Sequence, residues 1–239
     1  MADGNTIGLV NGNLGQILNF LAAAGGLGTA AMGLVDTTKV FGGGPSNFGF
    51  GYIETALEPF LAPLGAKSAH FGKSEVLQTM RANWLNGVAK ADQKAKTKSL
   101  IHLGLTKGNA ARLATAAGVD AAKLVSLVQK TASGVQPTQD EVNVLGQFDA
   151  VLSAVLDTAY ERGDQKYRNA SKCLAMVVAT ILGAVGGWIV FGGGSSYFGT
   201  SNFALSALVG FVATPLAPIA KDLATSLQAA VSAASTLKR

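Results

Sequence analysis

Charged residues are scarce in this chain of 239 residues, where Asp, Glu, Lys and Arg together make up 14%. An average soluble domain has about 25%. Aromatic residues contribute only 7%, whereas the chain contains 30 glycines and 49% hydrophobic residues. This composition excludes a disordered chain, which needs low hydrophobicity and high net charge. Abundant small residues with few charges are typical of helices that pack closely in lipid.

Residues that carry chemistry are also sparse. The single cysteine, Cys173, excludes an internal disulfide, and the two histidines, His70 and His102, lie far apart without a cysteine or carboxylate cluster at ligand spacing. No serine stands in a G-x-S-x-G motif, and neither run of glycines continues into the lysine of a phosphate-binding loop. We therefore expect no catalytic residue, no metal site and no cofactor, and a protein that is not an enzyme.

A glycine-rich segment occurs twice. Residues 33–49 align without a gap with residues 183–199, and ten of the 17 positions are identical, including an FGGG core in each copy. Each copy follows one apolar segment and precedes another, which ends in Ala-Pro-Leu or Ala-Pro-Ile. The repeat predicts two hairpins, each made of a helix, a glycine-rich loop and a second helix.

The second copy contains the clearest candidate for a membrane span. Residues 173–194 have no charge, which matches the length needed to cross about 30 Å of hydrocarbon. Basic residues precede this segment, and Trp188 lies near its other end, as in aromatic belts at membrane interfaces. A buried helix of a soluble domain is the alternative. Residues 203–219 form an uncharged partner segment, in which two prolines predict a kink.

The first copy carries charges that the second lacks. Asp36 and Lys39 lie three residues apart beside the loop, and Glu54 and Glu58 lie four apart, on one face of a helix. Because ionised groups are costly inside a bilayer, such residues usually face protein or water. These four residues are candidates either for an ion path or for a subunit contact at the membrane interface, and we favour the second interpretation.

The glycines of the two loops are candidate hinges: Gly42, Gly43 and Gly44 in the first copy, and Gly192, Gly193 and Gly194 in the second. Glycine permits the positive φ angles that a tight reversal of the chain requires. Unwound backbone inside a membrane is otherwise tolerated only where it is buried in protein or lines water. A tight connection is therefore the expected role, and a pore-lining loop is the alternative.

The segment between the copies is basic and predicts a soluble helical domain. Residues 67–172 contain 15 Lys or Arg against nine Asp or Glu. Asn109 or Thr106 and Asp120 are predicted helix caps, Gly118 a helix stop, and Thr138 to Glu141 a capping box. The capped helix is expected to continue towards the second span. The run of residues 90–98 fits either a solvated linker or a contact with anionic lipid headgroups. A helical hairpin over residues 106–130 has spacing like a DNA-binding motif but lacks base-reading side chains, so we expect no nucleic acid partner.

These patterns predict an all-α integral membrane protein. Residues 1–66 form the first hairpin, residues 67–171 the soluble domain, and residues 172–239 the second hairpin with a C-terminal amphipathic helix. We expect a cell inner membrane location with the basic domain cytoplasmic, because positive loops stay on that side, and with both FGGG loops opposite. The expected function is a structural subunit that forms homo-oligomers or joins other membrane subunits. The alternative is a channel or transporter that uses the hinges with Glu54 and Glu58.

Overall fold

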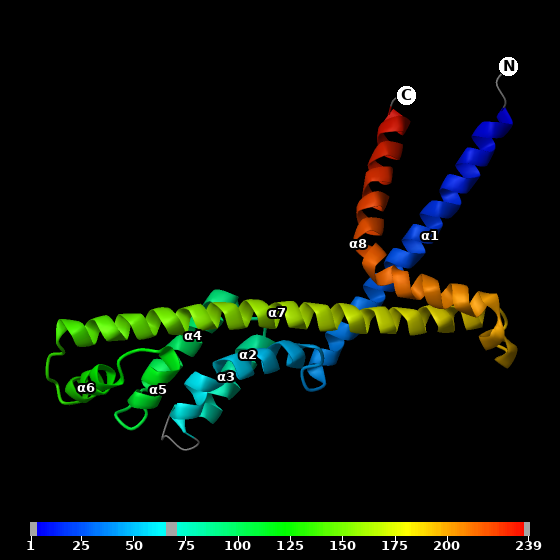
Figure 1. The fold of residues 1–239 in the computed structure, drawn as a ribbon. Helices are drawn as coiled ribbons and strands as arrows, with labels where there is room; N and C mark the ends of the chain where they lie inside the picture. The colour runs from blue at the N-terminus through cyan, green and yellow to red at the C-terminus, as the bar shows by residue number, and fades with distance from the viewer. Residues whose placement is uncertain (1–3, 66–70, 237–239) are drawn as a thin grey trace. The chain divides into compact units, whose positions relative to one another are not determined.

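The computed structural model describes residues 4–65 and 71–236, and every regular element within these ranges is a helix, as the sequence predicts. Figure 1 shows the helices in chain order. The α-helices are α1 (Gly4–Thr37), α2 (Ser46–Leu61), α3 (Lys73–Leu85), α4 (Lys90–Leu103), α5 (Ala110–Ala117), α6 (Ala121–Ala132), α7 (Gln139–Val190) and α8 (Ser201–Thr236). Three short 3-10 helices are η1 (Thr38–Val40), η2 (Ala62–Leu64) and η3 (Ser195–Gly199).

The chain forms two compact units. The first unit comprises residues 1–45 and 169–239, and the second unit comprises residues 46–168. Helix α7 therefore contributes residues to both, and it is continuous, as expected, from the capping box into the apolar segment. This division differs from the expected boundary after residue 66, because the apolar face of α2 is buried in the core of the second unit.

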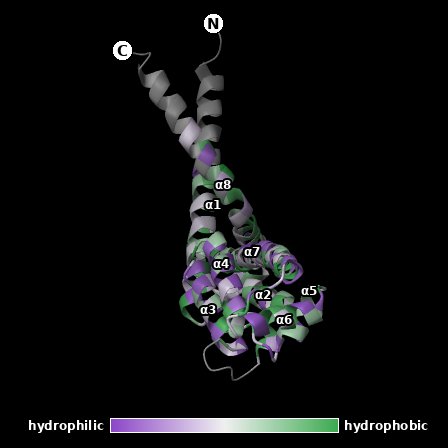
Figure 2. Cartoon of the chain, turned by 90° about the vertical axis from the view of Figure 1, so that its left-hand side faces the viewer, coloured by the Kyte–Doolittle hydropathy of each residue, from purple (hydrophilic) through white to green (hydrophobic). Residues whose placement is uncertain are grey.

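The second unit has a hydrophobic core made from one face of each of its helices. Figure 2 shows hydrophilic and hydrophobic residues alternating along α3 to α6, as amphipathic helices require. Helix α2 buries Ile53, Leu57 and Phe60, and α7 buries Phe148 and Leu152. The rings of Phe60 and Phe148 meet edge to face with centroids 6.2 Å apart. Aromatic pairs in this geometry stabilise a core beyond the area they bury.

Two glycines bring α2 and α7 into close contact. A Cβ atom at Gly49 would lie 2.6 Å from the carbonyl oxygen of Gly163, which leaves no room for a side chain. The indole of Trp84 lies beside this crossing, donates a hydrogen bond to the carbonyl oxygen of Ser46 at 3.0 Å, and contacts the Tyr167 ring. The beginning and the end of the second unit therefore meet.

Three ion pairs join α4 to α7. Lysines spaced four residues apart on α4 face aspartates spaced seven or eight apart on α7, so the two helices run antiparallel. The pairs are Lys90 with Asp164 at 2.9 Å, Lys94 with Asp157 at 2.5 Å and Lys98 with Asp149 at 3.3 Å. The run of residues 90–98 is thus a helix with three neutralised lysines, and the linker interpretation is wrong.

Local signals place most helix ends correctly. The side chain of Asp120 accepts a hydrogen bond from the Lys123 N–H at 3.1 Å and caps α6, as predicted. Gly118 ends α5 in the left-handed conformation, with φ of 67°, which glycine adopts without strain. Asn109 is the cap position of α5, but its amide bonds the Gly104 carbonyl and the Thr106 N–H instead of α5.

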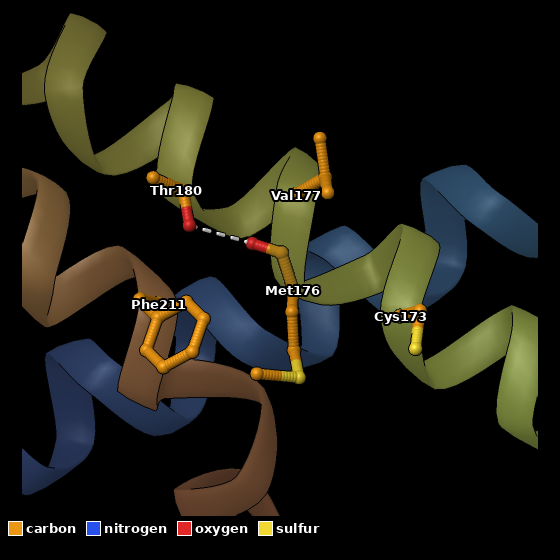
Figure 3. A pocket seen from close by; sticks show the side chains of 5 residues that line it. All are labelled: Cys173, Met176, Val177, Thr180 and Phe211. Atoms are coloured by element: carbon orange, nitrogen blue, oxygen red, sulfur yellow. Dashed lines mark hydrogen bonds between the residues drawn. The ribbon is translucent and has the colours of Figure 1, made fainter.

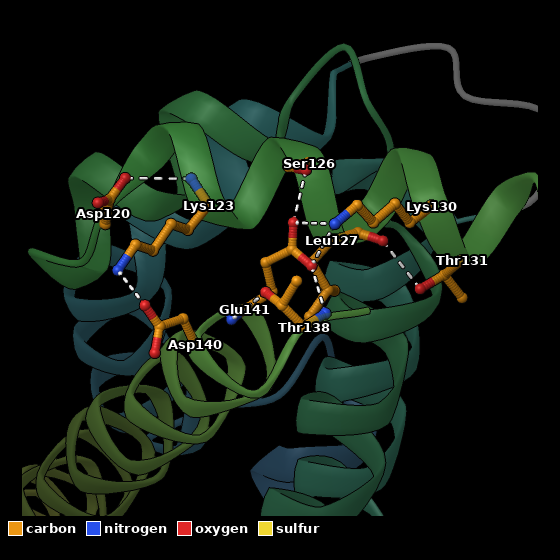
Figure 4. A network of polar contacts seen from close by, with 9 residues as sticks. All are labelled: Asp120, Lys123, Ser126, Leu127, Lys130, Thr131, Thr138, Asp140 and Glu141. Carbon is orange, nitrogen blue, oxygen red and sulfur yellow. Dashed lines mark hydrogen bonds and ion pairs between the residues drawn. The ribbon is translucent and has the colours of Figure 1, made fainter. Parts of the chain in front are cut away.

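The capping box of α7 extends into a polar network (Figure 4). The Thr138 N–H donates to the Glu141 carboxylate at 2.7 Å, and the Glu141 N–H donates to the Thr138 hydroxyl at 3.4 Å. Lys130 and Ser126 of α6 also donate to this carboxylate, at 2.9 Å and 2.6 Å. These donors, the Lys130 ammonium first, lower the pKa of Glu141 from 4.5 to about 2. One carboxylate therefore joins the start of α7 to α6.

Protonation of Glu141 is expected to loosen the junction between α6 and α7. Because the pKa is lower in the folded state, its contribution to stability is complete above about pH 4.5 and is lost as the pH falls towards 2. Glu141→Gln should lower the thermal midpoint at pH 7, measured by helical circular dichroism, and the difference from the unmodified chain should shrink at pH 2. A difference that is independent of pH would contradict the assignment.

Candidate functional site

Three helical segments are long and apolar enough to cross a membrane: residues 19–40, the C-terminal part of α7, and residues 201–220 of α8. All three belong to the first unit. The apolar windows of α7 and α8 have mean hydropathies of 2.2 and 1.9. Helix α2, which carries Glu54 and Glu58, is not among these segments. The first unit is therefore where a membrane-related function is to be sought.

Small residues form the contact between the end of α7 and the start of α8. A Cβ atom at Gly183 would lie 2.5 Å from the carbonyl oxygen of Ser206 and 3.0 Å from Gly210 Cα. A Cβ atom at Gly210 would collide with the Ala179 carbonyl, and one at Gly187 with the Ser206 and Tyr197 side chains. Only glycine permits backbones to approach so closely, and this contact geometry is common between helices in membranes.

Large apolar side chains, by contrast, point away from this contact. Along α7 they recur at helical spacing on the outer face, and along α8 they do the same. The exposed residues on α7 are Leu174, Val177, Ile181, Val185 and Ile189, and those on α8 are Leu205, Leu208, Phe211 and Ile219. Ile181 is 56% exposed and Leu205 is 58% exposed. In this helix pair the small residues lie at the contact and the large apolar side chains face outward. A helix pair in water has the opposite distribution.

An aromatic cluster closes the end of this helix pair. Tyr197 of η3 is buried, stacks on Phe191 with centroids 6.2 Å apart, and meets Phe203 edge to face at 5.7 Å. Phe198 packs against Phe203 at 5.6 Å, and Trp188 lies one turn before the loop. Amphipathic aromatic rings concentrate where a bilayer meets water. The cluster therefore marks one end of the apolar segment.

Helix α1 runs antiparallel to α8 (Figure 1). Gly25 faces Ala220, with its virtual Cβ atom 2.8 Å from the alanine side chain, and Gly28 packs on the backbone of Ala213. Ala31 of α1 joins Ala179 and Ala213 in a small buried cluster. All three helices of the first unit therefore meet through alanine and glycine.

Two prolines, Pro215 and Pro218, lie inside α8, which changes direction along its length (Figure 1). Each proline removes one backbone hydrogen bond and favours a kink, as the sequence predicts. Thr214 stands beside them, is only 3% exposed, and its hydroxyl is without a hydrogen-bond partner among the described atoms. No sequence pattern indicates this buried hydroxyl.

A shallow apolar groove of about 270 Å³ lies on α7 and α8. Its lining side chains come from one face of α7 and from Phe211 of α8 (Figure 3). The one polar group on this face, the Thr180 hydroxyl, donates to the Met176 carbonyl at 2.7 Å and so is satisfied within the helix. Cys173, whose side chain is exposed, stands at one end of the groove. The groove offers hydrocarbon contact only.

The four charged candidates do not form one group. Asp36 and Lys39 make an ion pair with each other beside η1 in the first unit. Glu58, on α2 of the second unit, binds the Lys73 ammonium through both carboxylate oxygens, at 2.6 Å and 2.7 Å. Glu54 is partly exposed on the same helix. The pairing of Glu58 with Lys73 was not expected, because no sequence pattern relates the two.

The glycine loops have the backbone conformation that their sequence suggests. Gly42, Gly43 and Gly44 all have positive φ, at 86°, 102° and 46°, as do Gly192 and Gly193, at 96° and 71°. Gly194 differs, because its φ is −80° and it precedes η3 in an extended conformation. The two loops therefore turn with similar backbones at first and then diverge.

Searches for similar proteins found no match among protein-family models, curated protein sequences or solved structures. The groups of His, Cys, Asp and Glu among the described residues include none that could hold a metal ion. The function must therefore be inferred from the chemistry of the two units.

The glycine contact between α7 and α8 makes a direct prediction. Gly183→Leu or Gly210→Leu should force the helices apart and destabilise the first unit by about 1–3 kcal/mol, the usual cost of overpacking. Thermal unfolding in mild detergent would measure the loss. Gly186→Leu is the matched control, because a Cβ atom at Gly186 meets nothing within 4 Å. Equal effects at Gly183 and Gly186 would contradict this packing.

Proposed function

We propose that this protein is a non-enzymatic integral membrane subunit, anchored by the hairpin of α7 and α8, that assembles with copies of itself or with other membrane subunits. The observation that carries the proposal is the reversed distribution of side-chain size on this hairpin. Glycine and alanine lie at the helix contact, while residues such as Ile181 and Leu205 are exposed.

The exposed face explains why a bilayer is the preferred surrounding. Soluble proteins rarely expose a contiguous apolar surface of more than a few hundred Å². Lipid removes this cost, because hydrocarbon tails solvate Ile181, Val185 and Leu208 as well as a protein core does. The two ends of the hairpin also support the proposal: the aromatic cluster around Tyr197 fits one interface, and exposed Lys172 fits the other.

Two crossings fit the chain connections better than the four expected from the repeat. Ser46 and Arg168 begin and end the second unit, so Pro45 and Asn169 must lie on one side of a bilayer that this unit does not cross. If α1 crossed the bilayer, both α1 and α8 would end on that side, and the two helices would run parallel. They are antiparallel instead. We infer that α7 and α8 cross and that α1 packs across them without spanning.

This topology places the first FGGG loop on the same side as the second unit, because Gly44 lies two residues before Ser46. The proposal differs here from the expectation that both FGGG loops lie opposite the basic domain. The second unit contains 14 Lys or Arg against 11 Asp or Glu, and this positive balance favours the cytoplasmic side of a cell inner membrane.

Assembly is supported by surfaces that the chain leaves open. On α1, Gly26 and Gly33 have no atoms within 4 Å of a virtual Cβ, and Ala30 between them is also exposed. A second helix can approach closely at such residues. The channel alternative has less support, because Glu58 is neutralised by Lys73 and its helix lies in the core of the second unit.

The proposal predicts different responses to a lysine at two exposed positions of α7. Ile181→Lys places a charge in the proposed lipid face, at a cost of about 2.5–3.5 kcal/mol on insertion scales, and should lower the membrane-bound fraction. Val142→Lys is the matched control, because Val142 is 46% exposed on the same helix in the second unit. The measurement is the fraction retained in membrane pellets after an alkaline wash. Release of the unmodified protein by that wash would refute the proposal.

Cysteine labelling tests the topology separately. In a Cys173→Ser background, Phe41→Cys and Ser133→Cys should react with an impermeant thiol reagent from one side of the membrane, and Ser196→Cys from the other. All three positions are exposed, so access to the reagent depends on the membrane alone. Reaction of Phe41→Cys from the same side as Ser196→Cys would restore the hairpin expected for the first copy.

A further inference from the structure

The second unit contains an apolar groove between α2 and α7, distinct from the groove beside Cys173. Its volume is about 330 Å³. Helix α2 contributes Tyr52 and Ala56, one turn apart, and α7 contributes Val151, Val155 and Ala159 from one face. These side chains offer hydrocarbon contact along the groove. The hydrophobic core of the unit lies beneath it, since Val151 and Val155 also pack against the core.

Two cations converge on one end of this groove. The Arg162 guanidinium donates a hydrogen bond to the Tyr52 hydroxyl at 3.2 Å, and the Lys166 ammonium lies 5.8 Å from the centre of the same ring. Both residues are exposed and follow Ala159 along α7. Tyr52 thus connects the apolar lining to a positively charged end.

These cations differ from most others in the second unit. Among the described residues, neither Arg162 nor Lys166 has a carboxylate within ion-pair distance. Seven other basic side chains among the described residues of the unit are paired with Asp or Glu. The paired residues are Lys73, Lys90, Lys94, Lys98, Lys123, Lys130 and Arg168. The end of the groove therefore has positive charge available for an anion.

We propose that this groove binds a fatty acid, with the hydrocarbon chain along Val151 and Val155 and the carboxylate between Arg162 and Lys166. The cations lie at one end of the apolar lining, which is the arrangement of a single hydrocarbon chain with one anionic head. A phospholipid would leave its second acyl chain in water. A single chain with an anionic head matches both the apolar lining and the charges, whether or not the first unit spans a membrane.

The test uses the full chain in phosphatidylcholine nanodiscs, a photoreactive diazirine fatty acid, and mass spectrometry of the labelled peptides. We expect label on peptides that contain Tyr52 or Val155. Unlabelled hexadecanoate should remove this label, and its methyl ester, at the same mole fraction in the lipid, should remove at least tenfold less. Equal competition by the ester, or label confined to residues 173–190, would overturn the proposal.

Two variants and a matched control separate the groove from general electrostatic attraction. Arg162→Gln with Lys166→Gln should reduce groove labelling at least tenfold. The control, Lys96→Gln with Lys107→Gln, removes the same charge from exposed positions on other parts of the unit and should leave labelling unchanged. Ala154→Phe should fill the groove from its exposed side and abolish labelling, with unchanged helical circular dichroism. An equal loss in the control pair, or full labelling of Ala154→Phe, would refute fatty acid binding here.

Discussion

Close contact between helix backbones at glycine is the interaction on which both units depend. In the first unit, Gly183 and Gly210 bring α7 against α8, and a side chain at either position would strike backbone atoms. In the second unit, Gly49 and Gly163 do the same for α2 and α7. Because dispersion attraction declines steeply with distance, helices with little side-chain bulk gain contact only by such close approach. The abundance of glycine is thus a packing requirement of this fold.

The two units use the same long helix with opposite distributions of side-chain size. In residues 139–168, α7 buries Phe148 and Leu152 and presents aspartates to the lysines of α4. In residues 169–190 it buries Ala175 and Ala179 and exposes Val177 and Ile181. The buried side chains of α7 change from large to small close to Lys172, the last charged residue of the helix. One uninterrupted helix therefore buries large side chains in one unit and exposes large apolar side chains in the other.

The helices that follow the two similar glycine-rich segments have different surroundings. Both loops begin with two glycines at positive φ, a conformation that glycine adopts without strain. After the loops the two segments differ: Phe50 and Ile53 of α2 lie in the hydrophobic core of the second unit, whereas Leu205 and Leu208 of α8 are exposed. Glu58 of α2 has a lysine partner, and the corresponding part of α8 is uncharged. Two similar FGGG loops can therefore precede helices as different as α2 and α8.

The sequence by itself determined the all-α class, the apolar segment of α7 and its continuity with the capped helix, because periodicity, length and caps such as Thr138 with Glu141 act over a few neighbouring residues. It also indicated the glycine turns and the kink at Pro215 and Pro218. Only the tertiary structure decided that α2 belongs to the second unit, that Lys73 neutralises Glu58 and that Arg162 meets Tyr52. Those contacts join residues between 15 and 110 positions apart, and no local pattern encodes which distant surfaces bury each other. The repeat suggested the same role for both copies, but packing against α3, α5 and α7 gave α2 another one.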